Sequence, residues 1–158
     1  MHMGEVVCSK RRIGKTHLPD VIERLEKAGK KVILSGLMLI MDDRDMKAVD
    51  DIAAMADDYL VEANDLSTIS LLQGKAHAIG PFINIYNEAT LKYYERGGAR
   101  RISLPPELPA SSLRALSESA TSDLEVQVFG RLPLAISARC YHARAHNLHK
   151  DGCQYICD

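Results

Sequence analysis

Four cysteines are the side chains of this sequence most suited to chemistry. Cys140, Cys153 and Cys157 lie near the carboxyl end with the spacing C-x12-C-x3-C, and Cys8 lies near the amino end. Disulfides are rare in the cytoplasm, so a set of cysteines there is typical of a metal site or of catalysis. Buried free thiols are the alternative interpretation, but Cys153 and Cys157 lie in a polar tail without an apolar face. We therefore expect the four cysteines to bind a metal centre.

The spacing of the cysteines leaves the identity of the metal open. Four thiolates hold either a tetrahedral zinc ion or a 4Fe–4S cluster. Zinc sites usually combine two short cysteine pairs, whereas this chain has one short pair, Cys153 and Cys157. A remote ligand such as Cys8, combined with a carboxyl-terminal group, fits a cluster better. Structural zinc is the alternative.

Three histidines, His142, His146 and His149, lie between Cys140 and Cys153 and could complete a Cys/His zinc site. The spacing of lone histidines is weakly specific, however. The same segment also carries three other basic side chains, Arg139, Arg144 and Lys150. We favour the interpretation of a basic loop, because positive charge would stabilise thiolates and an anionic cluster.

Polar side chains near the ends of predicted strands, together with Glu125 on the last strand, are the candidates for binding a substrate. They are Lys10, Arg11, Arg12, Glu62, Asn64, Asn84 and Glu125. The three consecutive cations would bind a carboxylate or phosphate group, and the others would line the same pocket. The alternative is a solvated loop for the cations and helix caps for the asparagines, as we expect for Asn87. Glu125 would point into the fold, with Arg131 or Arg139 as its partner.

Alternating strands and helices must position these side chains. Short β-branched runs predict strands at 5–8, 31–35, 59–62, 78–86, 101–104 and 124–129. Amphipathic stretches predict helices at 18–28, 43–55, 65–73, 87–96 and 111–121. The pair Gly80-Pro81 predicts a bulge or an irregular segment in the fourth strand. Residues 131–158 show no clear period.

This alternation predicts an α/β fold with a parallel sheet built from βα units. The motifs G-x-G-x-x-G and G-x-x-x-x-G-K-[ST] are absent from the sequence, which disfavours a nucleotide-binding, doubly wound sheet. Polar residues after several strands favour a TIM-barrel-like fold, whose sites lie in the βα loops. Because about six strands are fewer than eight, we expect an incomplete barrel. In this prediction residues 1–158 are a single partial barrel domain, with 131–158 as its cysteine-rich tail.

Composition excludes several classes of protein. Hydrophobic residues make up 46% and charged residues 26% of the 158 residues, which argues against disorder. The formal net charge of −1 argues against a strongly basic nucleic-acid-binding protein. The sequence has neither an apolar run long enough for a transmembrane helix nor the pattern of a signal peptide. We expect a cytoplasmic protein with no nucleic-acid partner.

Three segments carry a resemblance to a known family. They are G-E-V-V-C-S-K-R-R at 4–12, G-R-L-P-L-A-I-S-A-R-C at 130–140 and D-G-C-Q-Y-I-C at 151–157. Together with V-E-A-N-D-L at 61–66 and N-I-Y-N at 84–87, they resemble the UbiV family. These are bacterial ubiquinone-biosynthesis proteins of the collagenase-like peptidase (U-type peptidase) superfamily. The match runs through essentially the whole chain.

The resemblance implies a TIM-barrel-like fold and a 4Fe–4S cluster bound by Cys8, Cys140, Cys153 and Cys157, so that 131–158 is a cluster-binding tail. It also implies a heterodimer with a homologous partner, UbiU, and a role as a subunit of an oxygen-independent hydroxylase that acts on the ring of a ubiquinone precursor. Family members continue on both sides of the matched segment, so we expect an incomplete barrel. Other superfamily members hydroxylate RNA or are described as peptidases, but no Ser-His-Asp or Cys-His dyad stands out here.

Overall fold

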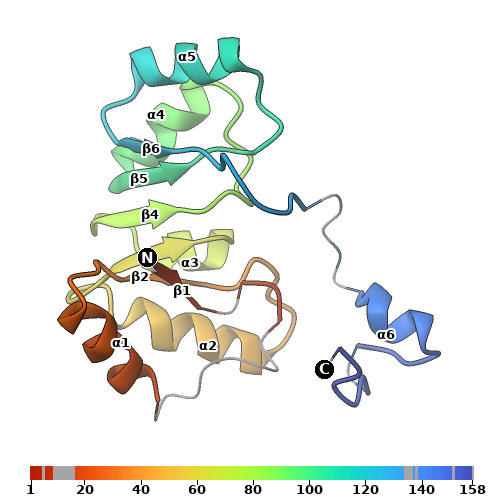
Figure 1. Ribbon diagram of the computed structural model, residues 1–158. Helices are drawn as coiled ribbons and strands as arrows, with labels where there is room; N and C mark the ends of the chain where they lie inside the picture. Colours follow the sequence, from red (N-terminus) through yellow and green to blue (C-terminus); the bar gives the residue numbers. More distant parts are fainter. Residues whose placement is uncertain (5, 9–16, 134–136, 138, 151, 158) are drawn as a thin grey trace.

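The computed structural model describes residues 1–158 except 5, 9–16, 134–136, 138, 151 and 158, and Figure 1 shows its elements in order. Its strands are β1 (His2–Met3), β2 (Ile33–Ser35), β3 (Leu60–Ala63), β4 (His77–Ile79), β5 (Ala99–Ser103) and β6 (Asp123–Glu125). Its helices are α1 (Leu18–Lys27), α2 (Asp43–Ala53), α3 (Leu66–Leu71), α4 (Glu88–Arg96), α5 (Ala110–Ser119) and α6 (Tyr141–Ala145). None of these helices is long and apolar enough to cross a membrane.

The described strands form one curled, parallel sheet in the order β1-β2-β3-β4-β5-β6 (Figure 1). A doubly wound sheet reverses its strand order near the middle, whereas the order here follows the sequence throughout. The curl brings side chains of the first and last strands together: His2 Nε2 on β1 lies 3.1 Å from Glu125 Oε2 on β6. The predicted fold class, an incomplete TIM-barrel-like α/β fold, is confirmed.

The two faces of the sheet differ in chemistry because successive side chains of a strand point to opposite faces. On the outer face Leu34, Val61 and Ile102 are buried in one apolar cluster, with Ile22 from α1 and Leu91 from α4. Each buried side chain of this size contributes about 1.5–3 kcal/mol to stability. The opposite, concave face carries mostly polar side chains and therefore positions the candidate site.

The first strand lies at His2–Met3 and not at the predicted 5–8. Gly4 has a φ of +151°, and a Cβ at this position would lie 2.2 Å from the carbonyl oxygen of Ser35. Glycine adopts such a backbone conformation readily. At Gly4 the chain turns out of the ladder before Val6. The carbonyl of Val6 then accepts a hydrogen bond from the Met38 N–H at 2.9 Å.

Two other strands end earlier than their apolar runs predict. β4 stops at Ile79, directly before Gly80-Pro81, because proline has no N–H to donate to a neighbouring strand. β6 stops at Glu125 and not at 129, because its partner β5 ends at Ser103, the residue opposite Glu125. In both segments the apolar run of the sequence continues past the last residue that pairs with a neighbouring strand.

Glu95, whose side chain is 7% exposed, joins α4 to the turn before β6. It accepts hydrogen bonds from the Thr121 N–H at 2.6 Å and from the N–H and hydroxyl of Ser122, each at 2.9 Å. Lys92 Nζ lies 2.8 Å from its other oxygen. Burial alone would raise the pKa of Glu95, but these hydrogen bonds outweigh burial and lower the pKa to about 2.

We expect Glu95→Gln to lower the free energy of unfolding by about 1–3 kcal/mol, because the amide loses the charge and presents an N–H₂ to donors. Urea denaturation at pH 7 measures this change, with the exposed Glu118→Gln on α5 as the control. The lowered pKa means that the Glu95 contribution is present above its ordinary pKa and is lost as the pH falls toward 2. Equal pH dependence of wild type and Glu95→Gln below pH 5 would contradict this assignment.

Candidate functional site

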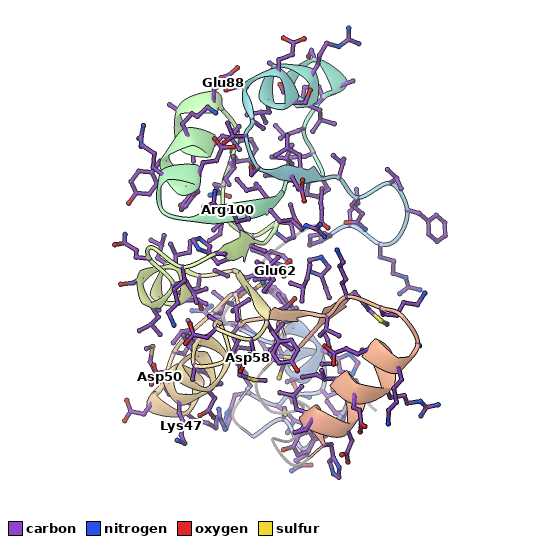
Figure 2. The ribbon with its side chains drawn as sticks, turned by 90° about the vertical axis from the view of Figure 1, so that its left-hand side faces the viewer. Lys47, Asp50, Asp58, Glu62, Glu88 and Arg100 are labelled. Carbon is purple, nitrogen blue, oxygen red and sulfur yellow. The ribbon has the colours of Figure 1, made fainter. Side chains whose placement is uncertain are left out.

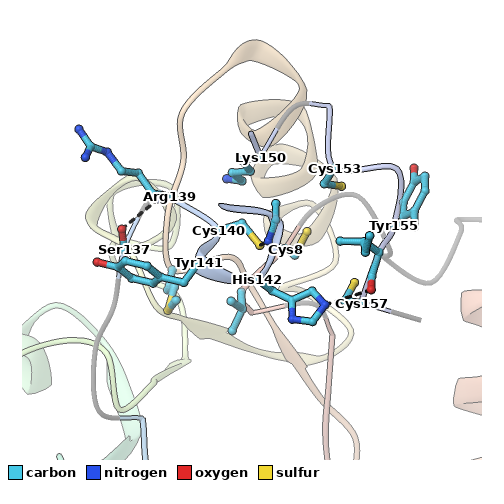
Figure 3. A pocket seen from close by; sticks show the side chains of 14 residues that line it. Cys8, Ser137, Arg139, Cys140, Tyr141, His142, Lys150, Cys153, Tyr155 and Cys157 are labelled. Atoms are coloured by element: carbon cyan, nitrogen blue, oxygen red, sulfur yellow. Dashed lines mark hydrogen bonds between the residues drawn. The ribbon is translucent and has the colours of Figure 1, made fainter. Parts of the chain in front are cut away.

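The four cysteines line one hollow of about 300 Å³ (Figure 3). Cys8 follows β1, whereas Cys140, Cys153 and Cys157 belong to the carboxyl-terminal tail. None of the four forms a disulfide; Cys157 is exposed, and the other three are partly buried. The structure therefore brings together residues from the two ends of the chain.

Local backbone geometry in the tail explains how three cysteines reach one place. Cys140 is the N-cap of α6, and its sulfur accepts a hydrogen bond from the Ala143 N–H at 3.4 Å. Gln154 and Tyr155, between the last two cysteines, have left-handed φ values of 51° and 56°. Non-glycine residues adopt this region infrequently, and the tight turn places Cys153 and Cys157 on the same hollow.

Basic side chains surround the cysteine hollow. Arg139, His142 and Lys150 contribute to its lining. His142 Nε2 lies 3.0 Å from the Ile156 carbonyl oxygen, and His149 Nδ1 accepts a hydrogen bond from the Gly152 N–H at 3.1 Å. Each of these two imidazoles therefore has one ring nitrogen bonded to a backbone group of the tail.

The cysteines that line this hollow are the residue type that a 4Fe–4S cluster takes as ligands. Such a cluster takes one thiolate per iron, four in all, and backbone N–H groups and positive side chains around the sulfurs stabilise its charge. The Ala143 N–H and the side chains of Arg139 and Lys150 are groups of this kind. Within the described part of the chain, no three His, Cys, Asp or Glu side chains converge as ligands of one metal ion.

A second, wider hollow of about 740 Å³ lies on the concave face, at the carboxyl ends of the strands. Glu62 and Glu125, two of the predicted substrate-binding residues, line it. Figure 2 shows Glu62 in the interior of the molecule, whereas Lys47 and Glu88 lie on the outer helices. Apolar side chains, including Phe82, form other parts of the lining.

The remaining predicted substrate residues are placed differently. Asn64 is buried behind Glu62, and its amide donates to Glu62 Oε1 at 3.0 Å and to the Gly36 carbonyl at 3.1 Å. Asn84 is exposed and is not among the residues that line the concave hollow. Lys10, Arg11 and Arg12 lie outside the described residues. Asn87 caps α4 as predicted, accepting from the Thr90 N–H at 2.9 Å.

His2 joins the two predicted glutamates and was missed by sequence reasoning. Its Nδ1 lies 2.7 Å from Glu62 Oε2, and its Nε2 lies 3.1 Å from Glu125 Oε2. The hydrogen bond with Glu62 raises the pKa of His2, and the charges of both carboxylates add to this against a smaller opposing effect of burial. Burial would raise the pKa of Glu62, but the bonds from His2 and Asn64 hold it below its ordinary value.

The arginine partner of Glu125 is Arg101, so the prediction of Arg131 or Arg139 is wrong. Arg101 Nη1 lies 3.0 Å from Glu125 Oε1, and the Ser103 hydroxyl donates to Glu125 Oε2 at 3.0 Å. Ser103 is directly opposite Glu125 in the parallel ladder, and Arg101 is two residues earlier on the same face. Neighbouring strands therefore supply the cation, a pairing that only the register reveals.

These observations define a class of structure: a curled, parallel half-barrel with a cysteine-lined hollow and a polar concave face. The sequence of residues 2–158 matches the family model of peptidase family U32. The chain belongs to this family. No solved structure matches the chain.

The packing of Gly80 against Asn64 yields a test of the concave face. A Cβ on Gly80 would lie 1.9 Å from Asn64 Oδ1, so alanine would force Asn64 to give up its bonds to Glu62 and Gly36. We expect Gly80→Ala to lower the free energy of unfolding by about 1–3 kcal/mol. Gly36→Ala is the control, because its Cβ would lie no closer than 3.4 Å to its neighbours. Equal stabilities of the two variants in urea would contradict the inferred role of Gly80.

Proposed function

We propose that this U32 protein is an iron–sulfur protein that carries a 4Fe–4S cluster on Cys8, Cys140, Cys153 and Cys157. The observation that carries the proposal is the shared hollow lined by four cysteines from opposite ends of the chain, none of them in a disulfide. When bound, such a cluster supplies one-electron transfer.

The residues around the thiols support this proposal through their charge. A cluster with four thiolates is anionic, and Arg139 and Lys150 would offset part of that charge. The Ala143 N–H would donate to the Cys140 sulfur, as it does to the free thiol. A peptidase mechanism receives less support, because His142 Nε2 is already bonded to the Ile156 carbonyl.

We further propose that the protein acts in oxygen-independent ubiquinone biosynthesis, as a UbiV-like subunit that works with UbiU. The motifs that resemble the UbiV family support this finer assignment. In this proposal the chain holds the cluster in its tail, and the concave hollow with Glu62 and Glu125 binds part of the ubiquinone precursor whose ring is hydroxylated. Arg101 and His2, the partners of Glu125, keep its carboxylate in place.

Anaerobic reconstitution with iron and sulfide tests the cluster. We expect about four irons and four sulfides per chain, with a broad charge-transfer absorption in the visible region. Changing any one of the four cysteines to serine should lower the iron content and weaken this absorption, because one iron of the cluster then loses its thiolate. Tyr141→Phe is the control, since Tyr141 lines the same hollow without offering a thiol.

Bound zinc without sulfide would contradict the iron–sulfur proposal and leave a structural metal site. Iron content that is insensitive to all four cysteine substitutions would contradict the assigned ligands.

The partner assignment has a separate test. We expect the chain to form a stable complex with UbiU when the two are expressed together without oxygen, measured by light scattering after affinity purification of tagged UbiU. A tagged, unrelated iron–sulfur protein is the control. Absence of a complex with the reconstituted chain would contradict the heterodimer.

A further inference from the structure

The first strand of the sheet has little backbone pairing of its own. β1 has two residues, aligned with Ile33 and Leu34 of β2, and it is an edge of the described sheet. The Ile33 N–H donates to the Met1 carbonyl at 2.9 Å, and Gly4 then turns the chain away. A strand this short requires side-chain contacts to stay in place.

The His2 side chain provides such contacts across the concave face. Its Nδ1 lies 2.7 Å from a carboxylate oxygen of Glu62 on β3, and its Nε2 lies 3.1 Å from a carboxylate oxygen of Glu125 on β6. A neutral imidazole carries one N–H, so it can donate to only one of these carboxylates. Both contacts are hydrogen bonds at the same time only when the ring is protonated.

The charged groups around His2 come from several elements. Glu62 and Glu125 favour its protonated form, whereas the amino group of Met1 opposes it. Beyond Glu125, Arg101 on β5 pairs with that carboxylate and with Asp123 on β6. The neighbouring hydroxyls of Ser35 and Ser103 are neutral. The carboxylates outweigh the cations, and the pKa of His2 is raised.

We propose that His2 is a pH-controlled clasp that ties the first strand across the concave face to the third and sixth strands. Glu62 is held ionised and buried, with 5% of its side chain exposed, and it is the fixed end of the clasp. Glu125 is 32% exposed and faces the wider hollow, so it is the end that separates first. His2 is 37% exposed, and its proton therefore exchanges with solvent.

The sign of the pH dependence follows from the two pKa shifts. A raised pKa of His2 in the folded state stabilises the clasp fully below the ordinary histidine value of about 6.5. The contribution is lost as the pH rises through the raised pKa. The lowered pKa of Glu62 means that its share is present above its ordinary pKa and is lost in acid. The clasp is therefore closed in weakly acidic solution and opens on the alkaline side.

The clasp also sets where the chain leaves the sheet toward Cys8. Only Gly4 and a few further residues separate β1 from Cys8, so release of β1 would free the one cysteine that lies outside the tail. The proposal stands on the contacts of His2, and it holds whichever metal the cysteines bind.

Amide hydrogen exchange of the whole chain, followed by NMR, tests the clasp. The Ile33 amide reports directly on β1 because it donates to the Met1 carbonyl. Its protection factor, corrected for intrinsic exchange, should fall between pH 6 and pH 9, by about tenfold for each unit by which the pKa of His2 is raised. In His2→Gln this pH dependence should vanish, whereas His17→Gln, which changes an exposed histidine before α1, should keep it.

A second measurement keeps the test valid if His2→Gln does not fold. The His2 ring carbon resonance in the wild type should titrate above the ordinary histidine value, and Glu125→Gln should bring this pKa down. Protection of Ile33 that stays constant across this range, or a His2 pKa that Glu125→Gln leaves unchanged, would overturn the proposal.

Discussion

The alternation of side chains along the parallel strands is the constraint on which this structure depends. Leu34, Val61 and Ile102 face the helices and build the core. Glu62 and Ser103, the next residues after Val61 and Ile102, face the concave side. Because the period is two, a register shift of one residue would exchange the two faces. The pairing that protects the core therefore also holds the polar hollow in place.

Three glutamates with buried or partly buried side chains connect elements of this fold, and each of the three is accompanied by a cation. Glu62 has His2, Glu95 has Lys92, and Glu125 has both His2 and Arg101. Burial by itself disfavours the ionised forms of Glu62 and Glu95, yet hydrogen bonds to the charged form win at both. Removing one partner would leave a charge without compensation, which costs more than the pair contributes.

The carboxyl-terminal tail is organised by different means. Its described residues form one short helix, α6, and include Asn147, Gln154 and Tyr155 with left-handed backbone angles, and most of them are exposed or only partly buried. Such a segment has little burial to stabilise it, and a metal bound by Cys8 and the three tail cysteines would add its binding free energy to folding. On the proposed function, the cluster would thus be a structural as well as a redox element.

The sequence by itself determined the order of the strands and of α1 to α5, the parallel α/β class and the cap at Asn87, because hydrophobic periods and caps are local. It also marked Glu62 and Glu125, since polar residues at the carboxyl ends of parallel strands meet at one edge of a sheet. It did not indicate α6, which lies in the segment 131–158 without a clear period. Only the tertiary structure decided that Arg101 accompanies Glu125, that His2 spans β1, β3 and β6, and that the first strand lies at His2–Met3. These features depend on register and curl, which join residues far apart in the chain, and no local pattern encodes them.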